Sequence, residues 1–424
     1  MLMPAQITTD PVFPSLHQAL DCEYAASALR DELAGAGFPA KRLVAELERV
    51  RLKPGRKALL GLRLLGEAID GNLIDQRLML TLWPGGKRGH LSVVDGNSED
   101  TPAFGPPLLQ SEALSGSAWF FPNDRKVIGI ARLLEQAKSF GTDIEVVHYV
   151  PEQGCTIRVD GPKGAIFGKA RVDDRCLAAA KVAIGAIKQD LVGLRLAPVI
   201  EYDATNRIMW QAAVKGDALS VADLCSGPAH WADRLASAIA AFHGLSPPAQ
   251  IELQTPQSTL GRIEWRAVRI RSAFPALSPD LAIVMSRLLA VAKPDSRLVL
   301  SHCDLHPANL LWDGESFALI DLDTCALAPA ALDHASLAAA FAQKMLATGM
   351  SADEIWRIVE ELQFAATARD AIEASDFLWN FAACLIAERL YRCGTRLKAN
   401  SKAMPMQLLG LAMRALTEIG GAND

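Results

Sequence analysis

The pattern of hydrophobic and polar positions divides the chain into a β-rich first half and a helical second half. Leu16, Leu20, Leu29 and Leu33 recur at helical intervals and predict a helix over residues 14–48. Residues 89–118 are rich in Gly, Ser and Pro and are predicted to be irregular, and 119–139 form a turn that leads into a short helix. Short apolar runs bounded by turn residues predict strands over 49–65 (a pair around the turn at 53–56), 75–83, 144–150, 155–159, 165–172, 199–203 and 207–213.

Beyond Lys215 the pattern becomes mostly helical, after a first predicted helix at 177–190. The exception beyond Lys215 is an apolar segment with strand character, Arg297–Asp323, which lies among the helices. A β-rich half followed by a helical half is typical of an α+β protein with two lobes. The predicted helices cover 177–190, 221–245, 259–273, 278–293, 332–348, 351–373, 376–396 and 404–419.

Two stretches of the β-rich half resemble each other. Val50 is followed four residues later by Pro54, and Val147 is followed four residues later by Pro151. Each pair leads into a second and a third predicted strand. This suggests an internal duplication of a small β unit, although chance similarity of short strand and turn sequences explains it equally well.

Composition narrows the class of protein. The chain has 424 residues, of which 50% are hydrophobic and 21% charged, which fits two or three globular domains with real cores. The formal net charge of −5 gives no bulk electrostatic reason to expect nucleic acid or an acidic membrane as partner.

The cysteines and the N-terminus indicate a compartment. The eight cysteines form no C-x-x-C pair, which gives no support to zinc-ribbon or thioredoxin-like sites, and scattered free thiols favour a reducing environment. The N-terminus has no secretory signal, and no apolar run reaches 18 residues. We therefore expect a cytoplasmic protein without a membrane partner; the sequence indicates no oligomeric state.

The segment Arg297–Asp323 carries the chemistry. Residues 298–300 are a short buried strand, and 310–312 and 317–320 are predicted to form a hairpin around Asp313-Gly314, a strong turn signal. Its polar residues are His302, Asp304, His306 and Asn309 between the strands, and Asp321 and Asp323 after the hairpin.

Phosphoryl transfer needs this arrangement. One carboxylate must accept the proton of the attacking hydroxyl group, and an Asn and a second carboxylate must hold Mg²⁺ against the nucleotide phosphates. Asp304 and Asn309 have the D-x-x-x-x-N spacing of a kinase catalytic loop, and the hairpin would bring Asp321 back beside Asn309. Oxygen ligands of this kind suit Mg²⁺.

The sequence SHCDLHPANLLW at 301–312, followed by FALIDLD at 317–323, resembles the aminoglycoside phosphotransferase and choline kinase family, whose fold resembles that of protein kinases. Cys303 stands where the family usually has Gly, and Leu322 where an aromatic residue is common. Residues 328–337 resemble another family segment, of which Asp333 is the surviving acid.

The resemblance implies an ATP-dependent kinase that transfers the γ-phosphoryl group to a hydroxyl group of a small molecule such as a sugar, amino sugar, aminoglycoside or choline-like compound. It implies Asp304 as catalytic base, Asn309 and Asp321 as Mg²⁺ ligands, and His306 and Asp323 as accessory residues. For His302, the family favours a structural role in the loop.

The resemblance also predicts the nucleotide side of the site. Lys169 holds the place of the phosphate-binding lysine, with Lys87 as the alternative in the first β unit, and backbone groups around Gln211–Ala213 would meet the adenine. Residues 177–190 lack the Glu that usually pairs with the lysine; Asp190, or Asp173 or Asp174, could replace it. If none does, the chain could be a pseudokinase that acts as a binding or scaffold protein.

A minor alternative assigns the same residues to a metal-dependent hydrolysis. The H-x-D-x-H pattern of His302, Asp304 and His306 could bind Zn²⁺ in a metal-dependent hydrolase. This hypothesis leaves Asn309 and Asp321 unexplained.

We expect three parts: an extra N-terminal unit over 1–118, seen also in maltokinase-like relatives, a small nucleotide-binding lobe over 119–214, and a helical lobe over 215–424 that holds the acceptor. The acceptor itself is not evident from the sequence.

Four acids of the late helices could hold a cationic acceptor, and two aromatic residues could stack on it. The simpler interpretation is that the acids lie on solvated helix faces and that the aromatic residues pack in the core. These residues are Asp370, Glu373, Asp376 and Glu388, with Trp379 and Tyr391.

Overall fold

The computed structural model describes residues 12–53, 55–86, 101–141, 143–162, 164–186, 191–291, 297–395 and 403–421. The chain forms two compact units. The first comprises Met1–Asp174, Glu201–Trp210 and Thr395–Ala399, and the second comprises Arg175–Ile200, Gln211–Gly394 and Asn400–Asp424. The predicted α+β class is confirmed, since antiparallel sheets dominate the first unit and helices the second.

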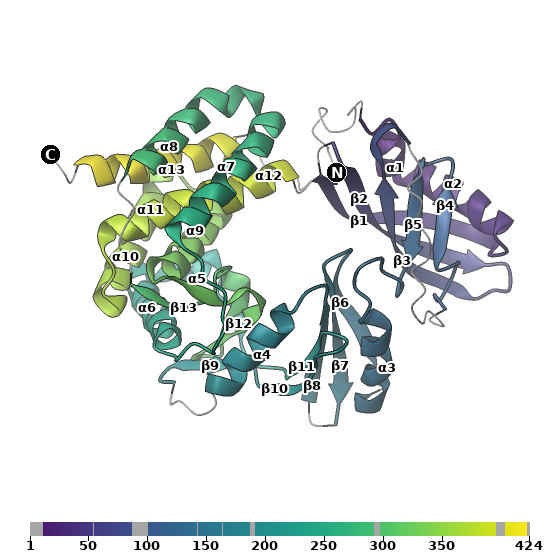
Figure 1. Ribbon diagram of the computed structural model, residues 1–424, viewed down its shortest axis with the longest axis horizontal. Helices are drawn as coiled ribbons and strands as arrows, with labels where there is room; N and C mark the ends of the chain where they lie inside the picture. The colour runs from purple at the N-terminus through teal and green to yellow at the C-terminus, as the bar shows by residue number, and fades with distance from the viewer. Residues whose placement is uncertain are drawn as a thin grey trace. The chain divides into compact units, whose positions relative to one another are not determined.

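The first sheet has five strands in the order β1-β2-β3-β5-β4, with all described pairs antiparallel. Helix α2 covers one face (Figure 1), and Leu29 and Leu33 from the helix share a core with Leu60 and Leu62 of β2. The elements are α1 (Leu16–Leu20), α2 (Cys22–Gly35), β1 (Ala40–Lys53), β2 (Lys57–Ala68), β3 (Leu73–Leu82), β4 (Leu108–Ser111) and β5 (Gly116–Phe120).

The second sheet has the order β10-β11-β8-β7-β6, and α3 packs against it. Both sheets therefore follow a helix, continue as a three-stranded meander, and add two further strands in the same order. This common topology supports the suspected duplication. The elements are α3 (Ile130–Phe140), β6 (Ile144–Val150), β7 (Gly154–Gly161), β8 (Gly164–Arg171), β10 (Val199–Asp203) and β11 (Ile208–Ala212).

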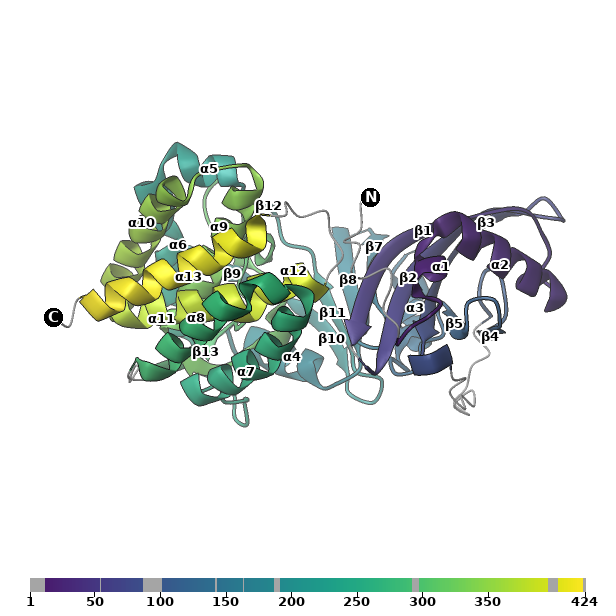
Figure 2. The same cartoon turned by 90° about the horizontal axis from the view of Figure 1, so that it is seen from above.

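The second unit is built around α9, most of which is buried. Figure 2 shows α13 lying along this bundle, where it contacts α8 and α11. No helix in the described ranges is both long and apolar enough to cross a membrane. The helices are α4 (Arg175–Ala186), α5 (Val221–Ser226), α6 (Pro228–His243), α7 (Pro256–Ala273), α8 (Ser278–Ala290), α9 (Ala331–Ala347), α10 (Ala352–Asp370), α11 (Ala374–Cys384), a π-helical turn η5 (Leu385–Leu390), α12 (Tyr391–Thr395) and α13 (Met404–Gly421).

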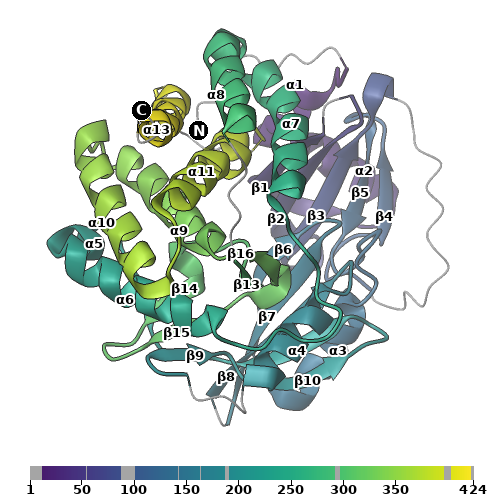
Figure 3. The ribbon, with the colours of Figure 1, turned by 60° about the vertical axis from the view of Figure 1, so that its left-hand side comes forward.

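Short strands within the second unit position the predicted catalytic segment. The hairpin of β14 and β15 forms as expected, and β9 joins it in parallel beside α6 (Figure 3). The strand before the catalytic loop, β13, pairs with β16 in a second small sheet. The strands are β9 (Leu194–Leu196), β12 (Asp217–Ala218), β13 (Leu298–Ser301), β14 (Leu310–Trp312), β15 (Phe317–Leu319) and β16 (Ala326–Pro329).

The prediction of a helix over 14–48 is wrong in its second half. The helix ends at Gly35, and β1 begins at Ala40. From Leu43 the buried positions alternate, and the long antiparallel pairing with β2 outweighs the helix propensity of this Ala-, Leu- and Glu-containing segment. The prediction that 89–118 is irregular is wrong for β4 and for the start of β5; the rest of this stretch up to residue 100 lies outside the described residues.

Candidate active site

The catalytic loop follows β13 and places Asp304 at a partly open position. The Asp304 side chain is 33% exposed, and its Oδ1 accepts a hydrogen bond of 3.0 Å from Arg392 of α12. Among the described residues nothing donates to its other oxygen, Oδ2. One carboxylate oxygen is thus oriented by a guanidinium, while the other is available to a hydroxyl group.

The hairpin brings the two predicted metal ligands to the same place. The Asn309 side chain is buried, and its Nδ2 donates to the Asp304 carbonyl oxygen at 3.2 Å, which leaves the side-chain oxygen as the acceptor. The Ile320 N–H donates to the Asn309 carbonyl oxygen, so the next residue, Asp321, comes back beside Asn309. Asp321 is exposed and has a left-handed backbone, with φ 62°. An amide oxygen next to a carboxylate fits Mg²⁺.

His302 ties the loop to the strand before Asp321. Its ring is fully buried, Nε2 lies 3.0 Å from the Ile320 carbonyl oxygen, and Nδ1 lies 3.4 Å from the Asp304 backbone N–H. The first contact needs a hydrogen on Nε2 and the second a bare Nδ1, so this tautomer uses both ring nitrogens within the loop. This arrangement does not offer His302, Asp304 and His306 together as zinc ligands.

The two accessory residues differ in their surroundings. His306 is half-buried, and burial, followed by the charges of Arg389 and Arg392, lowers its pKa to about 4 against the opposing charge of Asp304. His306 is therefore neutral at pH 7. Asp323 is buried in the turn after Asp321, so it is not positioned as an exposed ligand.

Asp333, at the start of α9, holds the backbone of the catalytic loop. Its carboxylate accepts hydrogen bonds from the N–H groups of His302 (2.6 Å) and Cys303 (2.9 Å). Cys303 has φ 64°, a left-handed conformation that favours glycine. This explains why the family usually has Gly there, and it shows that this chain accepts a strained residue at the same turn.

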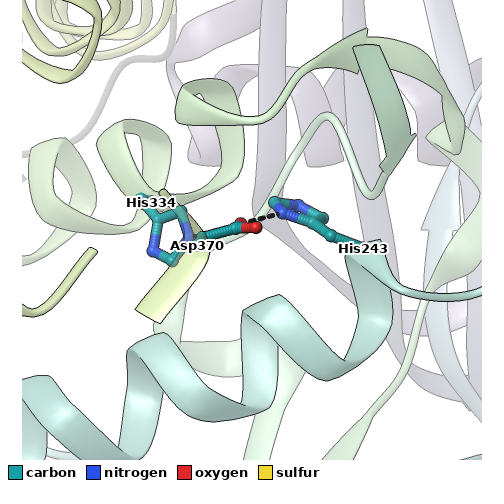
Figure 4. Close-up of side chains that lie close together, drawn as sticks. All are labelled: His243, His334 and Asp370. Carbon is teal, nitrogen blue, oxygen red and sulfur yellow. Dashed lines mark hydrogen bonds and ion pairs between the residues drawn. The ribbon is translucent and has the colours of Figure 1, made fainter. Parts of the chain in front are cut away.

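Asp333 belongs to a buried network that sequence reasoning missed. Nε2 of His243 is 3.1 Å from Asp333, and its Nδ1 bonds to the Asp370 carboxylate (Figure 4). His334 and Arg297 contact the same Asp370 carboxylate, at 3.0 and 2.5 Å. The sequence offered no signal for the pairing, since positions 243, 297, 333–334 and 370 are far apart along the chain.

Charge decides the protonation states in this network. Burial alone would lower the pKa of His243, but the hydrogen bonds and charges of Asp333 and Asp370 outweigh it and raise the pKa to about 9. The pKa of His334 is lowered, chiefly by burial. His243 is thus a buried imidazolium between two carboxylates, and with Arg297 it balances their charge.

The predicted nucleotide-binding residues lie on the second sheet and just after it. Lys169 is half-buried on β8, which runs between β7 and β11, so it is not an edge-strand lysine. Gln211 is buried near the end of β11, and Ala213 is exposed just beyond it. Lys169 belongs to the first unit, whereas Asp304, Asn309 and Asp321 belong to the second.

The alternatives proposed for the lysine and its acid have mixed outcomes. Lys87 and Asp190 lie outside the described residues. Asp174 is paired with Arg207, whose Nε donates to it at 3.0 Å. The structure thus gives Asp174 an arginine partner.

A second ion cluster was also missed. Lys57, at the start of β2, donates to both carboxylate oxygens of Glu152 in the turn between β6 and β7, at 2.5 and 2.6 Å. Both residues are buried, and Lys53, Arg125 and Lys126 lie 3.7–3.9 Å from the same carboxylate. Burial, together with the surplus of cations, lowers the pKa of Lys53 to about 8.

Most of the acids suggested for a cationic acceptor are not available to one. Asp370 is in the buried network, Asp376 is buried, and Glu388 is paired with arginines; only Glu373 is exposed. Trp379 is fully buried and donates to the Leu288 carbonyl oxygen, as core packing predicts. Tyr391 lies against the guanidinium of Arg266.

The model of the phosphotransferase enzyme family matches residues 192–370. Among solved structures, a choline/ethanolamine kinase family protein from Mesorhizobium loti is 14% identical (TM-score 0.46; 68% of this chain and 99% of that one). An aminoglycoside phosphotransferase from Streptomyces rimosus is 16% identical (TM-score 0.38; 68% and 97%), and a macrolide 2′-phosphotransferase from Brachybacterium faecium is 17% identical (TM-score 0.43; 66% and 97%).

A comparison with curated proteins found no match. At these identities and TM-scores the solved structures carry no argument about activity, so the assignment rests on the family match. The matched range contains the catalytic loop, the hairpin and Asp333. Residues 192–370 therefore match the phosphotransferase enzyme family, in agreement with the resemblance that the sequence shows at residues 301–323.

Proposed function

We propose that the chain is an ATP- and Mg²⁺-dependent kinase that phosphorylates a hydroxyl group of a small molecule. The observation that carries the proposal is the juxtaposition of Asp304, Asn309 and Asp321 by one loop and one hairpin. Asp304 keeps one oxygen available for the hydroxyl proton, and the Asn309 amide is turned so that its oxygen can accept a cation.

In the proposed reaction, the acceptor oxygen attacks the γ-phosphorus of ATP, the bond to the β-phosphate oxygen breaks, and the hydroxyl proton passes to Oδ2 of Asp304. Asn309 and Asp321 would hold Mg²⁺, which neutralises phosphate charge when it is bound. Residues 119–214 would form the nucleotide-binding lobe, with Lys169 on the phosphates and Gln211–Ala213 at the adenine.

The geometry also weighs against a scaffold without activity. A pseudokinase would not need a buried asparagine whose amide is turned by the Asp304 carbonyl, or a left-handed Asp321 beside it. Strained backbone of this kind is concentrated at functional sites.

The decisive experiment compares wild type with Asp304→Asn. Loss of a general base costs about 10²–10⁴-fold in turnover, whereas Mg-ATP binding, measured by calorimetry, should persist. The assay follows ADP release with a panel of hydroxyl compounds. Glu315→Gln, an exposed acid in the turn of the same hairpin, is the matched control and should behave like wild type. Wild-type turnover by Asp304→Asn would contradict the proposal.

A further inference from the structure

Two arginines pair with the acids Asp304 and Glu388. Arg392 bonds to Asp304 at 3.0 Å and to Glu388 at 3.1 Å. Arg266, on α7, bonds to Glu388 at 2.6 Å and to the Ala387 carbonyl oxygen. These contacts make Arg392 and Arg266 the partners of the two local acids.

A third guanidinium, that of Arg389, is buried close to these pairs. The residue is 4% exposed, and its Nε and one terminal nitrogen have no hydrogen-bond partner among the residues described. It lies close enough to Asp304 and His306 to influence both electrostatically. A guanidinium does not lose its proton in proteins, so its buried N–H groups are costly unless something accepts from them.

The backbone around Arg389 supports a binding role. Residues Leu385–Leu390 form a π-helical turn between α11 and α12, and such turns occur frequently at functional sites. The other titratable group nearby, His306, is neutral at pH 7 and does not supply the missing negative charge. Among the described residues, the two acids Asp304 and Glu388 therefore face Arg266, Arg392 and Arg389, and Arg262 also acts on Glu388, so positive charge exceeds negative charge near Asp304.

We propose that the acceptor is a hydroxyl compound with an anionic group, a carboxylate or a phosphate, and that the Arg389 guanidinium binds this group while Asp304 receives the hydroxyl proton. The inference rests on the proposed kinase function and names its substrate class. A cationic acceptor such as choline or an aminoglycoside would instead add a positive charge where the structure already has a surplus.

The test uses matched pairs of acceptors. Glycerate is compared with glycerol, and gluconate and glucose 6-phosphate are each compared with glucose, so that carboxylate and phosphate are separated; choline and ethanolamine are the cationic probes. Initial rates give kcat/KM, and calorimetry with Mg²⁺ and AMP-PNP gives the affinity for each probe. We expect at least one anionic probe to exceed its neutral partner about tenfold or more in both measurements.

Three variants test whether Arg389 binds the anionic group of the acceptor. Arg389→Gln should reduce kcat/KM for the preferred anionic probe by about 10–100-fold, with the KM for ATP unchanged, since charge-assisted hydrogen bonds are lost. Arg389→Lys, which keeps the charge, should restore part of the loss. Arg271→Gln, an exposed arginine at the end of α7, is the control. Thermal unfolding of each variant shows whether it is folded.

The outcomes separate the two proposals. Phosphorylation or tighter binding of neutral or cationic probes, with no preference for an anionic one, overturns the anionic acceptor but leaves the kinase intact. Binding of Mg-ATP without tighter binding of any anionic probe also overturns it. If neither Mg-ATP binding nor turnover is found, the kinase proposal itself fails. An anionic preference that survives in Arg389→Gln would mean that another arginine provides it.

Discussion

The buried imidazolium of His243 predicts an unusual loss of stability in mild alkali. The pKa of His243 is about 9 in the folded protein, against an ordinary value of 6.5, because the hydrogen bonds and charges of Asp333 and Asp370 outweigh its burial. A raised folded pKa contributes stability that is fully present below pH 6.5 and is lost as the pH rises through 9. In this window the unfolded chain has released the proton and the folded chain keeps it.

The magnitude follows from the number of protons. Because the folded state holds one more proton than the unfolded state, each unit of rising pH in this window lowers the free energy of unfolding by about 1.4 kcal/mol. The whole pKa shift of His243, from 6.5 to about 9, corresponds to about 3 kcal/mol. His306 and His334 act in the opposite sense at lower pH, because their folded pKa values are lowered. They cost stability as the pH falls below 6.5. Taken alone, these histidines place maximal stability near pH 6.5.

The assay is urea unfolding, followed by helix circular dichroism, at pH values from 6 to 10. His243→Gln keeps an amide donor but cannot carry the proton, so its difference from wild type isolates the effect of His243. Lys53, whose folded pKa is lowered to about 8, increases stability with pH in both proteins and cancels in this difference. The free-energy difference should shrink by about 3 kcal/mol between pH 6.5 and 9 or just above. Parallel pH profiles for the two proteins would show that His243 is not protonated in the folded protein.

The remaining predictions concern the loop and its ligands. Cys303→Gly should remain within about 1 kcal/mol of wild type in urea unfolding, whereas Cys303→Val should lose about 2 kcal/mol, since a branched residue fits a φ of 64° poorly; equal stabilities would argue against strain at this turn. Asn309→Ala and Asp321→Ala should weaken Mg²⁺-dependent ATP binding in calorimetry by tenfold or more, and unchanged affinity would remove them from the metal site. Lys169→Met should lose most of the thermal stabilisation by Mg-ATP, about 2 kcal/mol, and full retention would exclude this lysine.

The sequence was sufficient to predict the loop and hairpin that carry Asp304, Asn309 and Asp321, because this segment is local. The loop and the hairpin lie within about 25 residues, and Asp313-Gly314 determines the turn, so spacing alone brings Asn309 and Asp321 together. The same reasoning found β6, β7 and β8, which are also connected by short turns.

What could not be predicted depends on contacts between distant segments. The pairing of Asp370 with His243 joins positions 127 residues apart, and the pairing of Glu152 with Lys57 joins positions 95 apart. The spacing of hydrophobic and polar residues along the chain gives no indication of such a contact. Glu388 was one of the acids that could have held a cationic acceptor, and only the folded chain shows that it is paired with Arg266, 122 residues away.

The two sheets of the first unit have the same strand order but carry different residues on equivalent strands. The buried face of β2 packs under α2, and on its other face Leu59 packs with Met79, Trp119 and Leu108. On the second sheet, β7 and β8 bury Ile157 and Ala170 against α3, while Lys169 remains half-buried. Within the described residues, β3, the strand equivalent to β8, has no lysine. If the two sheets arose by duplication, the phosphate-binding role proposed for Lys169 has no counterpart on β3, and the start of β2 instead contacts the β6–β7 turn through Lys57 and Glu152.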